Sequence, residues 1–402
     1  MNFKNLFFAK WGAVNSANSA NFTSAQNSQN PQIPPKTKTL KHRKKASKKF
    51  RLFCKGGLLL NLFFLCIFLA SVSYLGLPAF EQSYILVGKD SNASVQNLLS
   101  RVAKRQIRAA GGIAALENPQ WLLANAEADQ YFKAKFNKLT DEQKALVDAL
   151  VQKGYFQGKF NANFFLGTDS KSAPESSGVG ASVVGTVLCM LVCMGIALPV
   201  GVAAAIYLEE FAPQNALTST IEVCINNLAG IPSIIFGLLG LALFINFFGL
   251  PRSSALVGGL TLAIMSLPII IVSTKAALKS VDVGVKNAAF ALGLTKWQMV
   301  RGVVLPLAAP MILTGAILAL ASAIGETAPL MLIGMIAFIP DVAGSLAEPT
   351  TVLPALIYNW ASMPERAFLE RAAAGILVLL TLVVALNLAA IMLRKYFQGR
   401  MQ

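Results

Sequence analysis

Charged residues are scarce in this 402-residue sequence: they make up 13% of it, whereas soluble domains carry about 25%. Apolar residues account for 55%. A single soluble core cannot hide so large an apolar excess, so the composition indicates a protein that lies largely in lipid. Histidine is almost absent as well. His42, the only one, lies in a basic tail, which argues against a histidine-based catalytic or metal site.

Aspartate and glutamate are missing from residues 1–55, which contain 12 lysines and arginines. Ten of these lie between Lys36 and Lys55, directly before an apolar run. A net charge of +16 suits either nucleic acid or a membrane surface. The position of the basic block favours the membrane, because lysines and arginines beside a spanning helix stay in the cytoplasm. We therefore expect contact with membrane lipid and no nucleic-acid partner.

Signals for metal, disulfide and nucleotide chemistry are also lacking. None of the five cysteines lies in the polar stretch 81–175, and no histidine or carboxylate accompanies Cys189 and Cys193. The sequence contains no G-x-x-x-x-G-K-[ST] string, so this chain has no P-loop for ATP hydrolysis. We expect no catalytic residue, no metal and no cofactor. The cysteines, expected as small buried apolar residues, are Cys54, Cys66, Cys189, Cys193 and Cys224.

Six apolar runs are long enough to span a bilayer. They predict an all-α polytopic membrane protein, because barrel strands would show short alternating segments instead. A long polar region precedes the first run and no small-x-small cleavage site follows it, so we interpret it as a retained anchor rather than a signal peptide. The runs are Gly56–Leu77, Val179–Ile206, Val223–Leu250, Ser253–Thr274, Val303–Ile339 and Ala372–Leu393.

The chain divides into four expected regions: a disordered basic tail 1–55, a first transmembrane helix 56–77, a soluble insert 81–175 and a membrane domain 178–395. The insert carries 12 basic and 10 acidic residues, and stretches such as Val95–Ala110 and Asp141–Gln152 predict that it is partly helical. Short basic loops face the cytoplasm. This rule predicts a periplasmic insert and two cytoplasmic termini.

The stretch Lys286–Pro306, KNAAFALGLTKWQMVRGVVLP, predicts a helix, a turn and a second helix. Gly293 suits the left-handed residue that ends the first helix, and Thr295 suits the cap of a helix running to Val304. We expect Leu294 and Trp297 to be exposed as docking anchors. Spacing alone does not separate this interpretation from an amphipathic loop resting on the membrane.

The stretch Ala321–Gly334, ASAIGETAPLMLIG, contains Glu326, the only ionisable residue of its apolar run. A charge in hydrocarbon costs about 2.5–3.5 kcal/mol on insertion scales, so we expect this carboxylate to face protein or an aqueous path. Gly325 and Pro329 should break the helix there. Two interpretations stay open: Glu326 lines a path, or it closes an interhelical hydrogen bond.

The first of these stretches resembles the EAA loop of ABC importer permeases, with two alanines, a glycine four residues later and a distal Leu-Pro. It departs where the family usually has Glu and this chain has Asn287. The resemblance implies a cytoplasmic coupling loop, residues 281–305, on which ATPase subunits dock. The implied coupling residues are Asn287, Ala288, Ala289, Gly293, Leu294 and Trp297.

Four strings, GETAP, LPALIYNWASMPE, IYLEEFAP and AGIPSIIFGLLG, resemble permease subunits of phosphate ABC transporters over about residues 178–395. That resemblance implies an ABC importer type I permease core in a bacterial inner membrane. It also implies a sister permease, two ATPase subunits and a periplasmic phosphate-binding protein as partners. The implied translocation-path or gate residues are Ser322, Gly325, Glu326, Thr327 and Pro329.

Ser322 stands where members of that family often carry Arg, which weakens direct contact with phosphate and leaves a related oxyanion open as substrate. Two other classes of protein also remain open. One is an ion-coupled secondary transporter or channel that uses Glu326. The other is a membrane-anchored sensor in which the insert acts.

Overall fold

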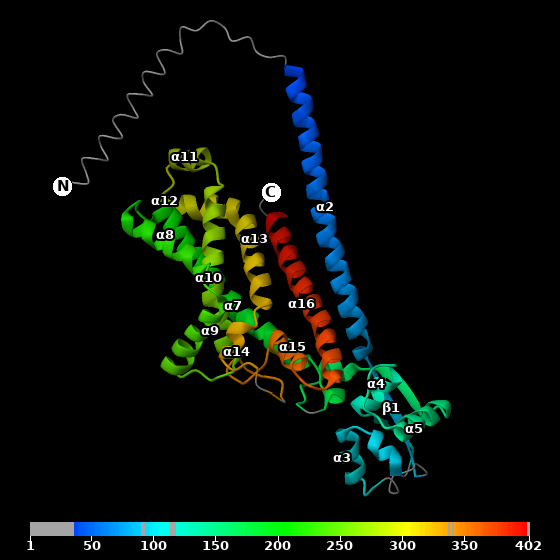
Figure 1. The fold of residues 1–402 in the computed structure, drawn as a ribbon. Coiled ribbons are helices and arrows are strands. Elements are labelled where there is room, and N and C mark those ends of the chain that lie inside the picture. Colours follow the sequence, from blue (N-terminus) through cyan, green and yellow to red (C-terminus); the bar gives the residue numbers. More distant parts are fainter. Residues whose placement is uncertain are drawn as a thin grey trace, which may run out of the picture. The chain divides into compact units, whose positions relative to one another are not determined.

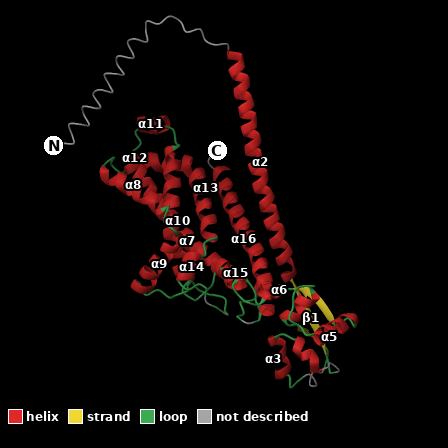
Figure 2. Cartoon of the chain, in the orientation of Figure 1, coloured by secondary structure: helices red, strands yellow, loops and turns green. Residues whose placement is uncertain are grey.

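The computed structural model of the chain describes residues 36–89, 93–112, 118–171, 173–336, 338–339 and 341–399 (Figure 1). The expected disorder of residues 1–35 lies outside the described residues. The chain forms two compact units, Met1–Phe68 and Leu69–Gln402. Helices dominate the described residues, and one short sheet lies in the second unit (Figure 2).

The first helix, α2, runs from Lys36 to Gly76. It includes the basic block, so the expectation that the disordered tail extends to residue 55 is wrong for residues 36–55. The physical reason lies in the composition: lysine and arginine have good helix propensity, and no proline lies between Lys36 and Gly76. The apolar part of this helix belongs to a segment, Ser47–Phe80, that is long and apolar enough to cross a membrane.

Five helices among the described residues are long and apolar enough to span a bilayer, or six if one bent pair counts as a span. The bent pair consists of Ala216–Leu228 and Ser233–Phe247, which meet at 103°. The sequence predicted a single span there, Val223–Leu250, and the bend falls between Leu228 and Ser233, where Gly230 and Pro232 lie. The other four segments after Ser47–Phe80 are Gly180–Phe211, Ala255–Lys279, Lys296–Ile324 and Arg366–Tyr396.

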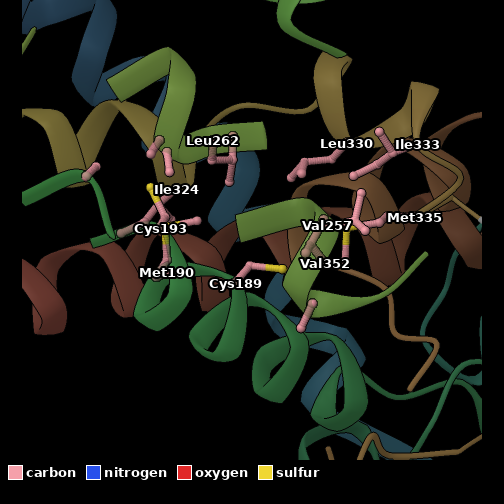
Figure 3. Packing of buried hydrophobic residues seen from close by; sticks show 14 of the residues in the cluster. Cys189, Met190, Cys193, Val257, Leu262, Ile324, Leu330, Ile333, Met335 and Val352 are labelled. Carbon is pink, nitrogen blue, oxygen red and sulfur yellow. The ribbon is translucent and has the colours of Figure 1, made fainter. Parts of the chain in front are cut away.

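The centre of the membrane domain is α10 (Ala255–Lys279), which packs against α7 (Gly180–Ile206) and α13 (Leu305–Ile324). In its most apolar 18 residues, 67% are buried, more than in any other candidate span. Glycine permits the close crossing with α7: a Cβ on Gly259 would lie 2.5 Å from Val192 Cβ. Figure 3 shows Cys189 and Cys193 in this core, as expected for small apolar side chains. The expectation of burial is wrong for Cys54, Cys66 and Cys224, which are exposed on the surface of this chain.

The insert contains a three-stranded antiparallel sheet of order β2-β1-β3, which the sequence analysis missed. Strand β1 (Glu81–Val87) is central and pairs with β2 (Gln120–Leu123) and β3 (Phe156–Phe160). Helices cover the sheet and close a separate apolar core. The helical elements of the insert are η2 (Ala93–Leu98), α3 (Arg101–Ala109), α4 (Ala126–Phe132), α5 (Asp141–Gln152), α6 (Ala162–Leu166) and η4 (Pro174–Ser176).

Buried ion pairs join the insert to the last helix, α16 (Arg366–Gly399). Glu370 accepts hydrogen bonds from Lys133 at 3.2 Å, from Lys135 at 2.9 Å and from Gln130 at 2.5 Å. Next to it, the buried Arg371 donates to the carbonyl of Ala79 at 3.2 Å. Such a cluster is favourable only while each charge keeps its partners. The insert is therefore anchored to the base of α16.

The remaining elements connect these parts and position the candidate sites. A 3-10 turn leads from α2 into β1, and a π-helical turn extends α7. Short helices follow the breaks in the membrane domain. The remaining elements are η1 (Leu77–Phe80), η5 (Tyr207–Phe211), α8 (Ala216–Leu228), α9 (Ser233–Gly240), η6 (Leu241–Phe247), α11 (Val283–Ala291), α12 (Lys296–Met299), η7 (Val300–Val304), α14 (Ala328–Leu332) and α15 (Leu353–Ala361).

Candidate functional sites

The segment 281–305 forms the helix, turn and helix that the sequence predicted. Asp282 caps α11 by accepting from the Gly284 amide at 2.5 Å. Gly293 ends the helix with φ of 83°, a left-handed conformation that glycine adopts without a Cβ penalty. Thr295 caps the start of α12 in a capping box, in which the Thr295 amide donates to the side-chain oxygen of Gln298 at 2.8 Å.

The second helix of this segment differs from the prediction in its far end. It does not stop at Val304: α12, the π-helical turn η7 and α13 run on without a break from Lys296 to Ile324. Pro306, near the start of α13, lacks the amide that an α-helix would use. The π-helical turn just before it is the local adjustment in hydrogen bonding that accompanies this proline. The segment is thereby joined directly to a spanning helix.

The inner face of the segment packs on the membrane domain. Ala289 is buried in an apolar cluster with Val281, Met299 and Val300. Leu294 is half-buried against the same cluster, so the expectation that its side chain is exposed is wrong. The reason is the reversal at Gly293, which turns the residue after it back toward the core.

The outer face of the segment carries exposed apolar side chains. Trp297 is 58% exposed, as predicted, and Asn287 and Ala288 are exposed as well. Leu292 was not among the predicted coupling residues, yet it is 83% exposed and lies four residues after Ala288, on the same side of a helix. Exposed leucine and tryptophan side chains gain free energy when a partner covers them. This face, with Ala288, Leu292 and Trp297, is the candidate docking surface.

The second candidate site is the break between α13 and α14. Helix α13 ends at Ile324 with Gly325 as its C-cap, and α14 begins at Ala328, so the predicted break is present. Glu326 lies in it and is half-buried. Within the described ranges, its carboxylate has no hydrogen-bond or ion-pair partner, and its amide donates to Ala323 at 3.2 Å. The interhelical hydrogen bond considered for Glu326 is therefore not formed in this part of the chain.

The five residues predicted around this break differ in how far their side chains are exposed. Ser322 and Gly325 are exposed, and Thr327 is half-buried. Pro329 is buried and packs on α9, where a Cβ on Gly237 would lie 2.6 Å from Pro329 Cα. The broken segment after α13 thus packs directly on the broken pair α8–α9. Pro329 has a packing role here, while Ser322, Gly325 and Glu326 remain available to a partner or to solvent.

Helix α13 connects the two candidate sites. It contains 20 residues, and a rise of about 1.5 Å per residue places its ends about 30 Å apart. That length matches the hydrocarbon thickness of a bilayer, about 30 Å. The two sites therefore lie at opposite ends of a helix that is about as long as the hydrocarbon layer is thick. A rigid helix between them can transmit displacement from one to the other.

The described part of the chain holds no group of three or more His, Cys, Asp or Glu side chains that could bind a metal ion. Cys189 and Cys193 lie together but have only apolar and hydroxyl neighbours, with the Cys193 sulfur 3.8 Å from the Ser266 hydroxyl. Such thiols serve as packing groups.

A family model described as "Binding-protein-dependent transport system inner membrane component" matches residues 197–402. Both candidate sites lie inside that match. The chain is 35% identical over 225 residues to the phosphate transport system permease protein PstA 1 of Mycobacterium tuberculosis, covering 54% of this chain and 71% of the relative. It is 31% identical over 225 residues to PstA of Yersinia pestis, covering 56% and 75%.

Another relative is the probable ABC transporter permease protein YqgI of Bacillus subtilis, 35% identical over 168 residues. This match covers 42% of the present chain and just over half, 56%, of the relative. Among solved structures, an inward-facing MetNI methionine ABC transporter chain is 20% identical and has a TM-score of 0.41, with 55% of this chain and 94% of that chain covered.

Proposed function

Since the chain belongs to the family of binding-protein-dependent transport system inner membrane components, we propose that it is the membrane-spanning permease subunit of an ATP-driven phosphate importer. The proposal that phosphate is the substrate rests on the 35% identity to a phosphate transport permease over 71% of that relative. Family membership and the apolar helices confirm the prediction of a multi-pass helical permease in the inner membrane.

The proposed complex contains this chain, a sister permease, two ATPase subunits and a periplasmic phosphate-binding protein. The exposed face with Ala288, Leu292 and Trp297 supports the ATPase contact, because it is apolar, projects from the bundle and joins a spanning helix without a break. Since the sequence lacks a P-loop, ATP hydrolysis is assigned to a separate chain. The basic tail and the basic segment 281–305 are assigned to the cytoplasm, and the insert to the periplasm.

The proposed translocation path passes the break after α13, with Glu326 and Ser322 facing the sister subunit. An unpaired carboxylate inside a membrane domain is costly unless water or a partner solvates it. Exposure of Ser322 and Gly325 in the single chain fits a surface that a second permease completes. Because Ser322 is uncharged, the positive charge that attracts phosphate is assigned to the sister subunit.

Uptake of radiolabelled phosphate tests this proposal. A strain that lacks the chain should lose high-affinity uptake and recover it with the wild-type gene, and excess sulfate or molybdate should not compete. Purification of the tagged chain should also recover an ATPase. An ion-coupled carrier would behave differently: it would need no ATPase and would stop when the ion gradient collapsed. Competition by sulfate or molybdate would reassign the substrate.

A further inference from the structure

The π-helical turn η5 (Tyr207–Phe211), which extends α7, contacts both helices of the segment 281–305. Lys286 of α11 donates to the Glu210 carboxylate at 2.5 Å. The centroid of the Phe211 ring lies 6.4 Å from the centroid of the Trp297 ring. The ammonium of Lys296 lies 5.4 Å from the centroid of the same Phe211 ring. Two adjacent residues of η5 therefore hold α11 and α12 by different interactions.

The same turn is tied to the membrane domain on its other side. Glu209 lies 3.6 Å from Lys279 and 4.0 Å from Lys275, both on α10. Lys275 in turn pairs with Glu222 of α8 at 2.5 Å. The acidic residues of η5 thus point in two directions: Glu210 toward the segment 281–305, and Glu209 toward the central helix.

The pair between Lys286 and Glu210 is more shielded from solvent than the pair between Lys279 and Glu209. The Glu210 side chain is 7% exposed and that of Lys286 is 18% exposed, whereas that of Lys279 is 62% exposed. Solvent screens an exposed pair, but a buried pair interacts at a lower effective dielectric and holds a definite geometry. Displacement of α11 is therefore transmitted to η5 more firmly through Glu210 than through a surface ion pair.

Helix α7 continues that connection into the bundle. It runs from η5 through buried Ala205 to Gly201, where an added Cβ would lie 2.7 Å from the Ile270 side chain of α10. Interiors packed this closely move as units rather than deform gradually. The π-helical turn itself is a local departure from α-helical bonding, of a kind that occurs often at functional sites.

We propose that Glu210 and Phe211 are positioning residues that couple the segment 281–305 to α7. In this account α11 and α12 move when the ATPase subunits close, and η5 conveys that movement to α7 and α10. Neither residue contacts ATP or substrate. The proposal rests on the proposed function, since it requires an ATP-driven partner on the segment 281–305.

The test uses the complete importer reconstituted in lipid vesicles, with phosphate taken up per ATP hydrolysed as the readout. The variants are Glu210→Gln, Lys286→Met and the charge exchange Glu210→Lys with Lys286→Glu. Lys279→Met is the matched control, because its ion pair is exposed and Glu209 keeps Lys275. Each single variant should still bind the ATPase and hydrolyse ATP while uptake per ATP falls about tenfold, a size typical of coupling between sites.

The charge exchange should restore most of the phosphate uptake per ATP that the single variants lose, and the control should match the wild type. An unchanged ratio in the single variants would overturn the proposal, as would uptake and hydrolysis that fall in proportion. A charge exchange no better than the single variants would overturn it too. If the single variants fail to assemble, Phe211→Leu decides, because it keeps apolar volume and removes only the ring contacts: a lower ratio supports the proposal and a wild-type ratio overturns it.

Failure of the proposed function gives a different result. In that case the wild-type complex itself shows no ATP-dependent uptake of phosphate, whatever the variants do.

Discussion

Trp360 of α15 donates its indole N–H to the Asp169 carboxylate at 2.8 Å, and both side chains are buried. This contact joins the end of the insert to the membrane domain across 191 positions of sequence. Burial raises the pKa of Asp169 above its ordinary value, although the hydrogen bonds from Trp360 and from the Ser170 amide oppose that shift. Ionisation of this carboxylate is therefore less favourable in the native state than in the unfolded state, and it lowers the stability of the fold.

The first prediction follows from the sign of that shift. Between the ordinary pKa of aspartate, about 3.9, and the raised native pKa, the folded state binds more protons than the unfolded state, so stability falls as pH rises. Asp169→Asn removes the ionisation but keeps an oxygen to accept from Trp360. Relative to the wild type, the variant should gain thermal stability from pH 4 to pH 7, measured on the full chain in detergent.

Asp141→Asn is the control, because the Asp141 side chain is 99% exposed and its charge stays hydrated. Its stability relative to the wild type should change little over the same range. A difference for Asp169→Asn that shrinks toward neutral pH would show that the folded state favours the ionised carboxylate after all.

The second prediction concerns the anchoring of the insert at Glu370. Glu370→Gln leaves Lys133 and Lys135 without their shared carboxylate in a buried site, which should cost about 3–5 kcal/mol. Lys135→Met should cost less, since that side chain is 24% exposed and Glu370 keeps Lys133. Denaturant unfolding and limited proteolysis between residues 81 and 175 measure both effects. Equal resistance of Glu370→Gln and wild type would contradict the assigned anchor.

The third prediction tests the contact between the two broken segments. Gly237→Ala places a Cβ against Pro329 and should destabilise the chain by about 1–3 kcal/mol through overpacking. Gly195→Ala is the matched control, because a Cβ there has no neighbour within 4 Å. The control should be neutral or slightly stabilising, as expected for alanine in a helix. Thermal unfolding in detergent compares them, and equal midpoints would refute the close packing of α9 on α14.

The fourth prediction concerns Glu326. Glu326→Gln should lower the rate of phosphate uptake by at least about tenfold if its charge serves the path, with no loss of bound ATPase. Thr314→Val on α13 provides the control, because Thr314 is exposed and its hydroxyl only bonds to the Pro310 carbonyl and Arg394. Unchanged uptake in Glu326→Gln would remove this residue from the path.

Local signals in the sequence predicted the parts of the sites that depend on local chemistry. Gly293 had to be the left-handed residue because only glycine adopts that conformation freely, and Thr295 preceded residues suited to a capped helix. The break at Gly325 followed from a glycine and a proline flanking the only charge in an apolar run. These features need no information from distant residues.

The features that were missed depend on distant residues. Strand β1 pairs with residues 33 or more positions away, so its state is decided by partners rather than by its own propensity. Lys286 and Glu210 are 76 positions apart, and the local sequence around either residue does not indicate the other as its ion-pair partner. Leu294 and Leu292 have the same side chain on opposite sides of a turn, so only the path of the backbone decides which is exposed.

The central claim is that the exposed face of the segment 281–305 binds a separate ATPase, and site-specific photocrosslinking tests it most directly. A photoreactive residue at Leu292 or Trp297 of the full chain in its membrane should capture the ATPase, whereas one at Leu388, exposed on the apolar part of α16, should not. Buried Ala289 is unsuitable for this purpose. Capture at Leu292 and Trp297 alone is the predicted result. No capture at either position, in membranes that take up phosphate, would contradict the account.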